Sequence, residues 1–82
     1  MTGWSMVVNV QLLGYLAKYS PTQKETFRLE LEPGATLGEL LGKIDFPPNL
    51  EKMVLVNGHR SNEATRLTDG DEVFIFSPAA GG

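Results

Sequence analysis

The sequence predicts an α+β domain in which one helix covers one face of a mixed sheet of four to five strands. Three observations predict this class. Four segments are apolar or alternate between apolar and polar residues, one segment has helical periodicity, and the helix falls between the second and third strands. The 82 residues are enough for one domain, near the small end of what folds alone.

The first two predicted strands are residues 6–12 and 24–31. In the first, Asn9 and Gln11 alternate with apolar residues, which is typical of a half-buried strand. The second alternates in the same way. Between them, the segment GYLAKYSPT (residues 14–22) is expected to be a loop with a short helical turn, so the two strands are predicted to form a hairpin.

Residues 36–44 are predicted to form the helix, eight to ten residues long. Thr36 and Glu39 have the spacing of a capping box. Gly38 and Gly42 lie one turn apart, and we expect them to let a neighbouring backbone approach closely. The prolines at positions 47–48 end the helix. Its apolar face has the i, i+3, i+4, i+7 spacing and consists of Leu37, Leu40, Leu41 and Ile44.

The last two strands are predicted at residues 53–56 and 72–76. An Asn57-Gly58 turn closes the first of them, residues 59–67 read as a polar loop, and a turn on Asp69 and Gly70 precedes the last strand. The apolar last strand suits an interior place in the sheet beside the first strand. A mixed sheet wrapped around one helix, with a right-handed crossover, is the β-grasp arrangement. The predicted core is Val8, Val10, Phe27, Leu29, Leu37, Leu40, Leu41, Ile44, Leu55, Val73 and Ile75.

Composition excludes several classes of function. The chain has no cysteine, so it has neither disulfides nor a cysteine-based zinc site. Its net charge of −3 and its scattered Lys and Arg argue against nucleic acid. No apolar run reaches the roughly 20 residues that cross a bilayer, and the first residues do not resemble a signal peptide. We therefore expect a cytoplasmic protein that is a monomer when free and binds no membrane.

The side chains do not form a convincing catalytic or metal site. The only histidine, His59, lies in the predicted polar loop, and Asp69, Asp71 and Glu72 cluster at a turn where turn chemistry explains them. The segment PGATLGEL lacks the spacing and the lysine of a P-loop. We expect no catalytic residue, no metal and no bound cofactor, and hence a chain that is not itself an enzyme.

One further reactive group does not belong to any side chain, namely the C-terminal carboxylate of Gly82. Residues 77–82, which we call the tail, reach roughly 20 Å at about 3.3 Å per residue. Pro78 fixes φ at the root of the tail, and Ala79, Ala80 and Gly81 add almost no bulk. Such a tail suits threading through a narrow tunnel into another protein, although a chance glycine pair at a disordered terminus is the simpler alternative.

The order and spacing of several motifs resemble one known family. These motifs are ATLGELL at the helix, VLVNG at the third strand, LTDGDEVFIFSP at the last turn and strand, and the terminal AAGG. Over residues 6–82 the chain resembles the ubiquitin-like sulfur carriers, which include the small subunit of molybdopterin synthase and the thiamin-thiazole sulfur carrier. Pro78 makes the tail more similar to the molybdopterin synthase small subunit. Residues 1–5 lie outside the resemblance and are expected to be a disordered extension, followed by the domain at 6–76 and a flexible tail at 77–82.

The resemblance implies a cycle in which the chain is a co-substrate. An adenylating enzyme of the ubiquitin-activating type uses ATP to convert the Gly82 carboxylate to an acyl-adenylate. A sulfurtransferase then supplies the sulfur of a thiocarboxylate. The large subunit of molybdopterin synthase accepts the tail and moves the sulfur to a pterin precursor of the molybdenum or tungsten cofactor.

Other functions remain open at this stage. The chain is alternatively a protein modifier that forms isopeptide bonds to lysines through Gly82, a sulfur carrier for thiamin thiazole or amino-acid biosynthesis, or an inert interaction module.

The two phenylalanines of the last predicted strand can either contact a partner or pack within the domain. Phe74 and Phe76 alternate with Val73 and Ile75, so both faces of the last strand are apolar. We expect Phe74 and Phe76 to form a docking surface with Pro78, the alternative being that they pack under residues 14–22 or against Trp4.

Overall fold

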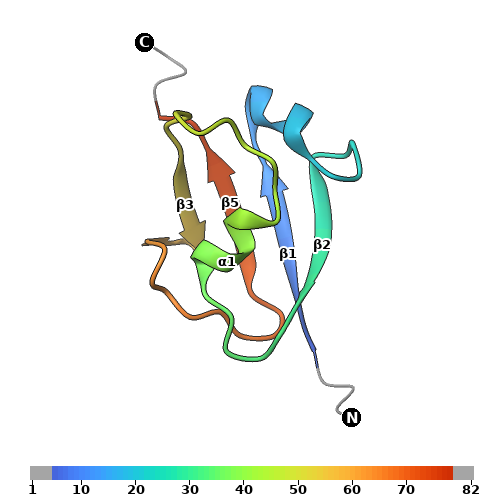
Figure 1. Cartoon of the computed structure of the whole chain (residues 1–82), viewed down its shortest axis with the longest axis vertical. Helices are drawn as coiled ribbons and strands as arrows, with labels where there is room; N and C mark the ends of the chain where they lie inside the picture. Colours follow the sequence, from blue (N-terminus) through green and yellow to red (C-terminus); the bar gives the residue numbers. More distant parts are fainter. Residues whose placement is uncertain (1–4, 79–82) are drawn as a thin grey trace.

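Five strands form one mixed sheet in the order β2-β1-β5-β3-β4 (Figure 1). The structure, a computed structural model, describes residues 5–78. β1 pairs with β2 antiparallel and with β5 parallel, and β3 pairs antiparallel with both β5 and β4. The strands are β1 (Met6–Leu12), β2 (Thr26–Leu31), β3 (Met53–Val56), β4 (His59–Ser61) and β5 (Glu72–Phe76).

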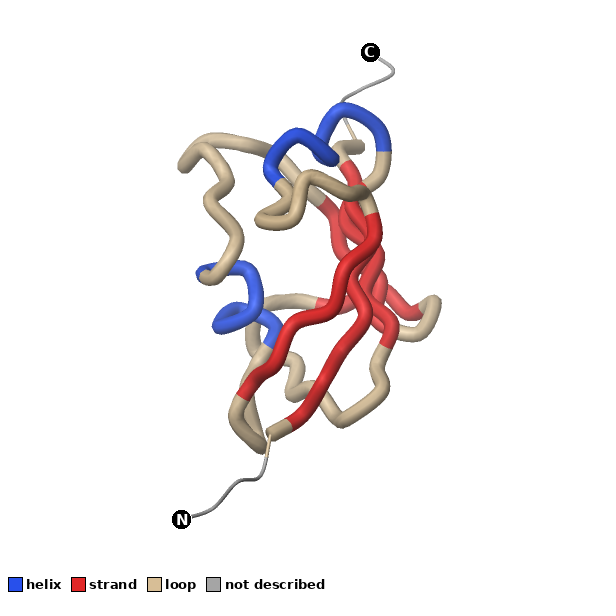
Figure 2. Tube along the Cα trace, turned by 90° about the vertical axis from the view of Figure 1, so that its right-hand side faces the viewer, coloured by secondary structure: helices blue, strands red, loops and turns tan. Residues whose placement is uncertain are grey.

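One face of the sheet packs against the helix α1 (Leu37–Gly42). Figure 2 shows the sheet from the side, with α1 to its left, on one face only. Along β1 and β5, buried residues alternate with more exposed ones, as the strand period requires. The short 3-10 helix η1 (Gly14–Tyr19) follows β1 and adds the buried Leu16 to the core. The predicted hairpin of the first two strands, the short helical turn and the interior position of the last strand are all confirmed.

Backbone hydrogen bonds tie the first turn of α1 to the loop after β4. The predicted capping box is present: the Thr36 side chain accepts from the Glu39 amide, and the Glu39 carboxylate accepts from the Thr36 amide. The Gly38 amide donates to the Glu63 carbonyl at 3.0 Å. A Cβ on Gly38 would lie 3.2 Å from that carbonyl oxygen, so the expected close approach is confirmed there. It is wrong for Gly42, where an added Cβ meets no described atom within 4 Å.

Three predicted boundaries are wrong. The second strand begins at Thr26 rather than at residue 24. The α-helix is six residues long rather than eight to ten, because the amides of Lys43 and Ile44 bond to carbonyls three residues back and tighten the last turn. The polar loop at 59–67 contains β4, whose residues pair with β3 across the Asn57-Gly58 turn. Asn57 has a φ of 53° and Gly58 a φ of 84°, the left-handed pair that a tight hairpin turn needs.

Eight of the eleven predicted core residues are buried, and the prediction is wrong for Leu29, Leu41 and Leu55. Val54 and Val56 face the core, whereas Leu55 lies on the opposite face and is only half-buried. Leu29 and Leu41 are also half-buried and pack at the edge of the core. The prediction omitted eight buried residues, namely Met6, Leu12, Leu16, Leu31, Ala35, Val54, Val56 and Leu67.

A hydrogen-bond network centred on Asp71 fixes the turn before β5. The Asp71 carboxylate accepts from the Thr68 amide and hydroxyl and from the Asn57 side-chain amide, at 2.8 to 2.9 Å. The Asn57 side-chain oxygen in turn accepts from the Glu72 amide. Burial by itself raises the pKa of Asp71, but these hydrogen bonds to the charged form bring that pKa below its ordinary value of 3.8. The turn chemistry predicted for this acidic cluster therefore has a specific structural role.

Candidate functional site at the C-terminal end of the sheet

The root of the tail leaves the domain from the centre of the sheet. β5 lies between β1 and β3, so the strand that leads into Ser77 and Pro78 is held on both sides. The Ile75 carbonyl also accepts a hydrogen bond from the Leu13 amide at 2.9 Å, just past the end of β1. A tail that begins here starts from a fixed position, which favours aiming it at a partner.

The two phenylalanines of β5 face away from the core. Val73 and Ile75 are fully buried, whereas Phe74 is 36% exposed and Phe76 is half-buried. An exposed Phe in a central strand is unusual enough to indicate a contact surface. The structure therefore agrees with the prediction that both residues lie on the outer face.

Strand register places further apolar residues beside the two phenylalanines. Leu55 is the register partner of Phe74, and Met53 is the register partner of Phe76. Residues directly opposite each other on antiparallel strands share a face. The outer face thus carries a patch of four apolar side chains, which we call the docking face: Met53, Leu55, Phe74 and Phe76.

Sequence reasoning missed half of the docking face. Residues 53–56 are all apolar, so no alternation indicates which side chains point outward. The antiparallel register with β5 decides it, because Leu55 must share the face of Phe74. Arg60, the β4 partner of Leu55, lies on the same side and supplies a cation at the rim.

Phe76 lies where the docking face meets η1. It shares a small cavity of about 180 Å³ with Leu13, Gly14, Tyr15 and Ser77. The alternative that Phe76 packs near residues 14–22 therefore holds in part, while Phe74 remains more open. Tyr15 is itself 49% exposed, so the aromatic surface continues past the end of β5.

The predicted tail residues Ala79, Ala80, Gly81 and Gly82 lie outside the described residues, as does Trp4. Pro78 is described and exposed. Within residues 5–78, no group of three or more His, Asp or Glu side chains is placed to hold a metal ion. The same part of the chain contains no helix with the length and apolar character needed to cross a membrane.

Comparisons with solved structures identify the fold. A putative molybdopterin converting factor subunit 1 from Pyrococcus furiosus superposes with a TM-score of 0.77 at 21% identity, covering 92% of this chain and all of that one. SAMP1 from Haloferax volcanii gives 0.73 at 22% identity over 93% of this chain and 99% of that one. A ubiquitin-like domain from Arabidopsis thaliana gives 0.59 at 15% identity over 95% and 82%. These similarities confirm the ubiquitin-like β-grasp fold.

A comparison with curated protein sequences finds no significant match. A family model does match, over residues 10–82, and it describes the ThiS family. This match covers nearly the whole domain together with the tail. The chain therefore belongs to the ThiS family of ubiquitin-like sulfur carriers.

Proposed function

We propose that the chain is a sulfur carrier whose Gly82 carboxylate is converted to a thiocarboxylate. The observation that carries the proposal is the family match, which continues past the domain and through Gly81 to Gly82. The family's small proteins are typically non-catalytic carriers. The chain then acts as a protein co-substrate.

The chemistry follows from the poor reactivity of a carboxylate. An adenylating enzyme of the ubiquitin-activating type joins the Gly82 carboxylate to AMP from ATP, and pyrophosphate leaves. A sulfur nucleophile, delivered by a sulfurtransferase, then attacks the acyl carbon and AMP leaves, so that one oxygen of the carboxylate is replaced by sulfur. The chain contributes the acyl group and its presentation, and no cofactor is bound by the chain itself.

The acceptor that we propose is the large subunit of molybdopterin synthase, with this chain as the non-catalytic small subunit. Two observations support this choice within the family. One similar structure is named as a putative molybdopterin converting factor subunit 1, and Pro78 stands directly before the last four residues. The sulfur then passes to a pterin precursor during synthesis of the molybdenum or tungsten cofactor.

Contacts between the docking face and each partner supply the binding energy and orient the domain so that the tail points toward the partner. Phe74 and Phe76 contact the adenylating enzyme and the synthase large subunit in turn, because aromatic side chains are favoured anchors in interfaces. Pro78, Ala79, Ala80 and Gly81 thread into each partner, where their small side chains fit a narrow tunnel. The fixed root of the tail reduces the conformational freedom that binding must remove.

The test is activation of the full chain and of a variant that lacks Gly82. With the adenylating enzyme and ATP, the full chain should form an acyl-adenylate and release pyrophosphate, and the shortened chain should not. Both chains should melt at the same temperature, since the deletion lies past the last strand. Equal activation of the two chains would falsify the assignment of Gly82.

A second function is favoured by the similarity to SAMP1, which is named a small archaeal modifier protein. In that case the activated Gly82 carbonyl is attacked by a lysine amine of another protein, AMP leaves and an isopeptide bond forms. Incubation with the activating enzyme, ATP and a cell extract separates the two functions. Conjugates of high molecular weight that require Gly82 indicate a modifier, whereas sulfur incorporation without conjugates indicates a carrier alone.

A further inference from the structure

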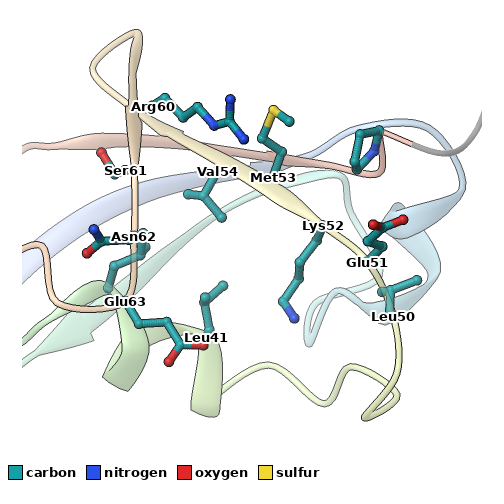
Figure 3. Close-up of a pocket in the computed structure, with 12 residues that line it drawn as sticks. Leu41, Leu50, Glu51, Lys52, Met53, Val54, Arg60, Ser61, Asn62 and Glu63 are labelled. Carbon is teal, nitrogen blue, oxygen red and sulfur yellow. The ribbon is translucent and has the colours of Figure 1, made fainter.

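A groove on the helix side of the sheet lies next to the root of the tail. It has a volume of about 490 Å³ and runs between α1 and the β3–β4 edge of the sheet (Figure 3). Leu41 from α1, Leu50 from the preceding loop and Val54 from β3 provide its apolar lining. Met53 of the docking face also lines the groove, so the two surfaces meet at the β3 edge of the sheet.

Strand register brings the tail directly to this groove. Phe76 pairs with Met53 across the antiparallel β5–β3 ladder. Pro78 stands two residues after Phe76 and Glu51 two residues before Met53, and both line the groove. The tail therefore starts at the end of the groove rather than at a distance from it.

The groove also contains a cation at a suitable position. Lys52 follows Glu51, and Figure 3 shows its side chain reaching into the groove. Its Nζ lies 5.1 Å from the centroid of the Phe46 ring, which holds the ammonium near the surface of the domain. Arg60 also lines the groove, but its β3 partner is Leu55, four residues along the chain from Glu51, whereas Lys52 is next to Glu51. The two remaining charged residues, Glu51 and Glu63, repel a carboxylate. Lys52 is therefore the favoured partner for an anion.

We propose that this groove binds the chain's own residues 79–82, with the Gly82 carboxylate paired to Lys52. Four residues span at most roughly 13 Å at about 3.3 Å each, and they start at Pro78, which lines the same groove as Lys52. Two alanine methyl groups and two glycines add little bulk, so they fit beside Leu41 and Leu50. The proposal rests on the proposed function in one respect, namely that Gly82 carries the free carboxylate.

Tail binding in this groove regulates access to the carboxylate. A tail that lies in the groove is withheld from a partner's tunnel, so the apparent affinity for the partner falls in proportion to the fraction of chains with a free tail. A partner that binds the docking face contacts Met53 at the rim of the groove and so competes with the tail there. The tail can then leave the groove for the tunnel while the domain stays bound.

Methyl and amide NMR spectra test the proposal without any partner protein. The spectra of the full chain are compared with those of a chain that lacks residues 79–82. We expect the truncation to shift the resonances of Leu41, Leu50 and Lys52, while Phe74 on the opposite face stays unchanged. Changes confined to Ser77, Pro78 and Glu51 would overturn the proposal and leave the groove for another occupant.

A zero-length cross-link provides the second test. A water-soluble carbodiimide activates the Gly82 carboxylate, the Lys52 amine attacks the activated carbonyl, and a urea leaves, so the chain loses one water in total. We expect a Gly82–Lys52 amide in the monomer that disappears in Lys52→Arg. Lys43→Arg is the matched control, because Lys43 lines a different groove beside β2. Equal cross-linking of Gly82 to all lysines, or none to Lys52, contradicts the proposal.

The two proposals fail in distinguishable ways. The NMR and cross-linking experiments use no ATP and no activating enzyme, so a negative result there leaves the sulfur chemistry of Gly82 intact. A chain whose tail binds the groove but that is never adenylated overturns the proposed function instead.

Discussion

Replacing Phe74 and Ile75 separately by alanine tests the assignment of the two faces of β5. The residues are neighbours, yet Phe74 is 36% exposed and Ile75 is fully buried. Full burial of a large apolar side chain contributes about 1.5–3 kcal/mol, and roughly two thirds of the Phe74 surface is covered. Phe74→Ala should therefore lower the free energy of unfolding by about 1–2 kcal/mol, whereas Ile75→Ala should lower it by about 2–5 kcal/mol, the range for buried large-to-small changes.

Affinity for the activating enzyme should fall more in Phe74→Ala than in Ile75→Ala, the opposite of the order in stability. If Phe74 anchors the activating enzyme, Phe74→Ala weakens that complex by about 1–2 kcal/mol or more, which corresponds to about 5- to 30-fold in Kd. Urea denaturation measures the stability of each variant, and calorimetric titration with the activating enzyme measures its affinity. Lys43→Ala, on the opposite side of the sheet, is the control and should leave the affinity unchanged. Unchanged affinity in Phe74→Ala, or a loss of stability as large as that of Ile75→Ala, refutes the docking face.

Three further predictions test the fold. Leu40→Ala should lower the free energy of unfolding by about 2–5 kcal/mol because Leu40 is fully buried, and Leu41→Ala should lower it clearly less because Leu41 is half-buried. Equal losses in urea denaturation would show that the helix face is misassigned. Gly42→Ala should stabilise the protein by up to about 1 kcal/mol through helix propensity. Gly38→Ala should lack this gain because its Cβ would lie 3.2 Å from a backbone oxygen. Melting temperatures that rise equally in the two variants would contradict the close approach at Gly38. Because the folded pKa of Asp71 lies below its ordinary value of 3.8, its carboxylate stabilises the fold above that pH, and this contribution is lost as pH falls through the lower folded pKa. The free energy of unfolding measured between pH 2 and 5 should therefore depend less on pH in Asp71→Asn, and an unchanged dependence argues against the network.

Local signals in the sequence were sufficient for most of the fold. The alternation in residues 6–12, the capping box from Thr36 to Glu39 and the Asn57-Gly58 turn each indicate one structure, and all three are present. β4 could not be predicted in this way. It is a three-residue edge strand of mostly exposed residues, so burial imposes no pattern on its sequence, and pairing with β3 alone defines it.

The candidate site was predictable only where alternation is visible. Phe74 lies between two residues that must be buried together, so its outward direction follows from the strand period. Leu55 has apolar neighbours on both sides, and only its register with Phe74 places it on the outer face. The groove beside the tail depends on contacts between α1 and β3–β4, which no local pattern in the sequence encodes.

The central claim is that sulfur is carried on the Gly82 carboxylate and delivered from it. The most direct measurement is the intact mass of the chain after incubation with ATP, the adenylating enzyme and a sulfide donor, followed by fragmentation of the C-terminal peptide. The account predicts the mass gain of one oxygen replaced by sulfur, located at Gly82, and its disappearance when the synthase large subunit and the pterin precursor are added. An unchanged mass, sulfur on any other residue, or a thiocarboxylate that persists with both acceptors present would contradict it.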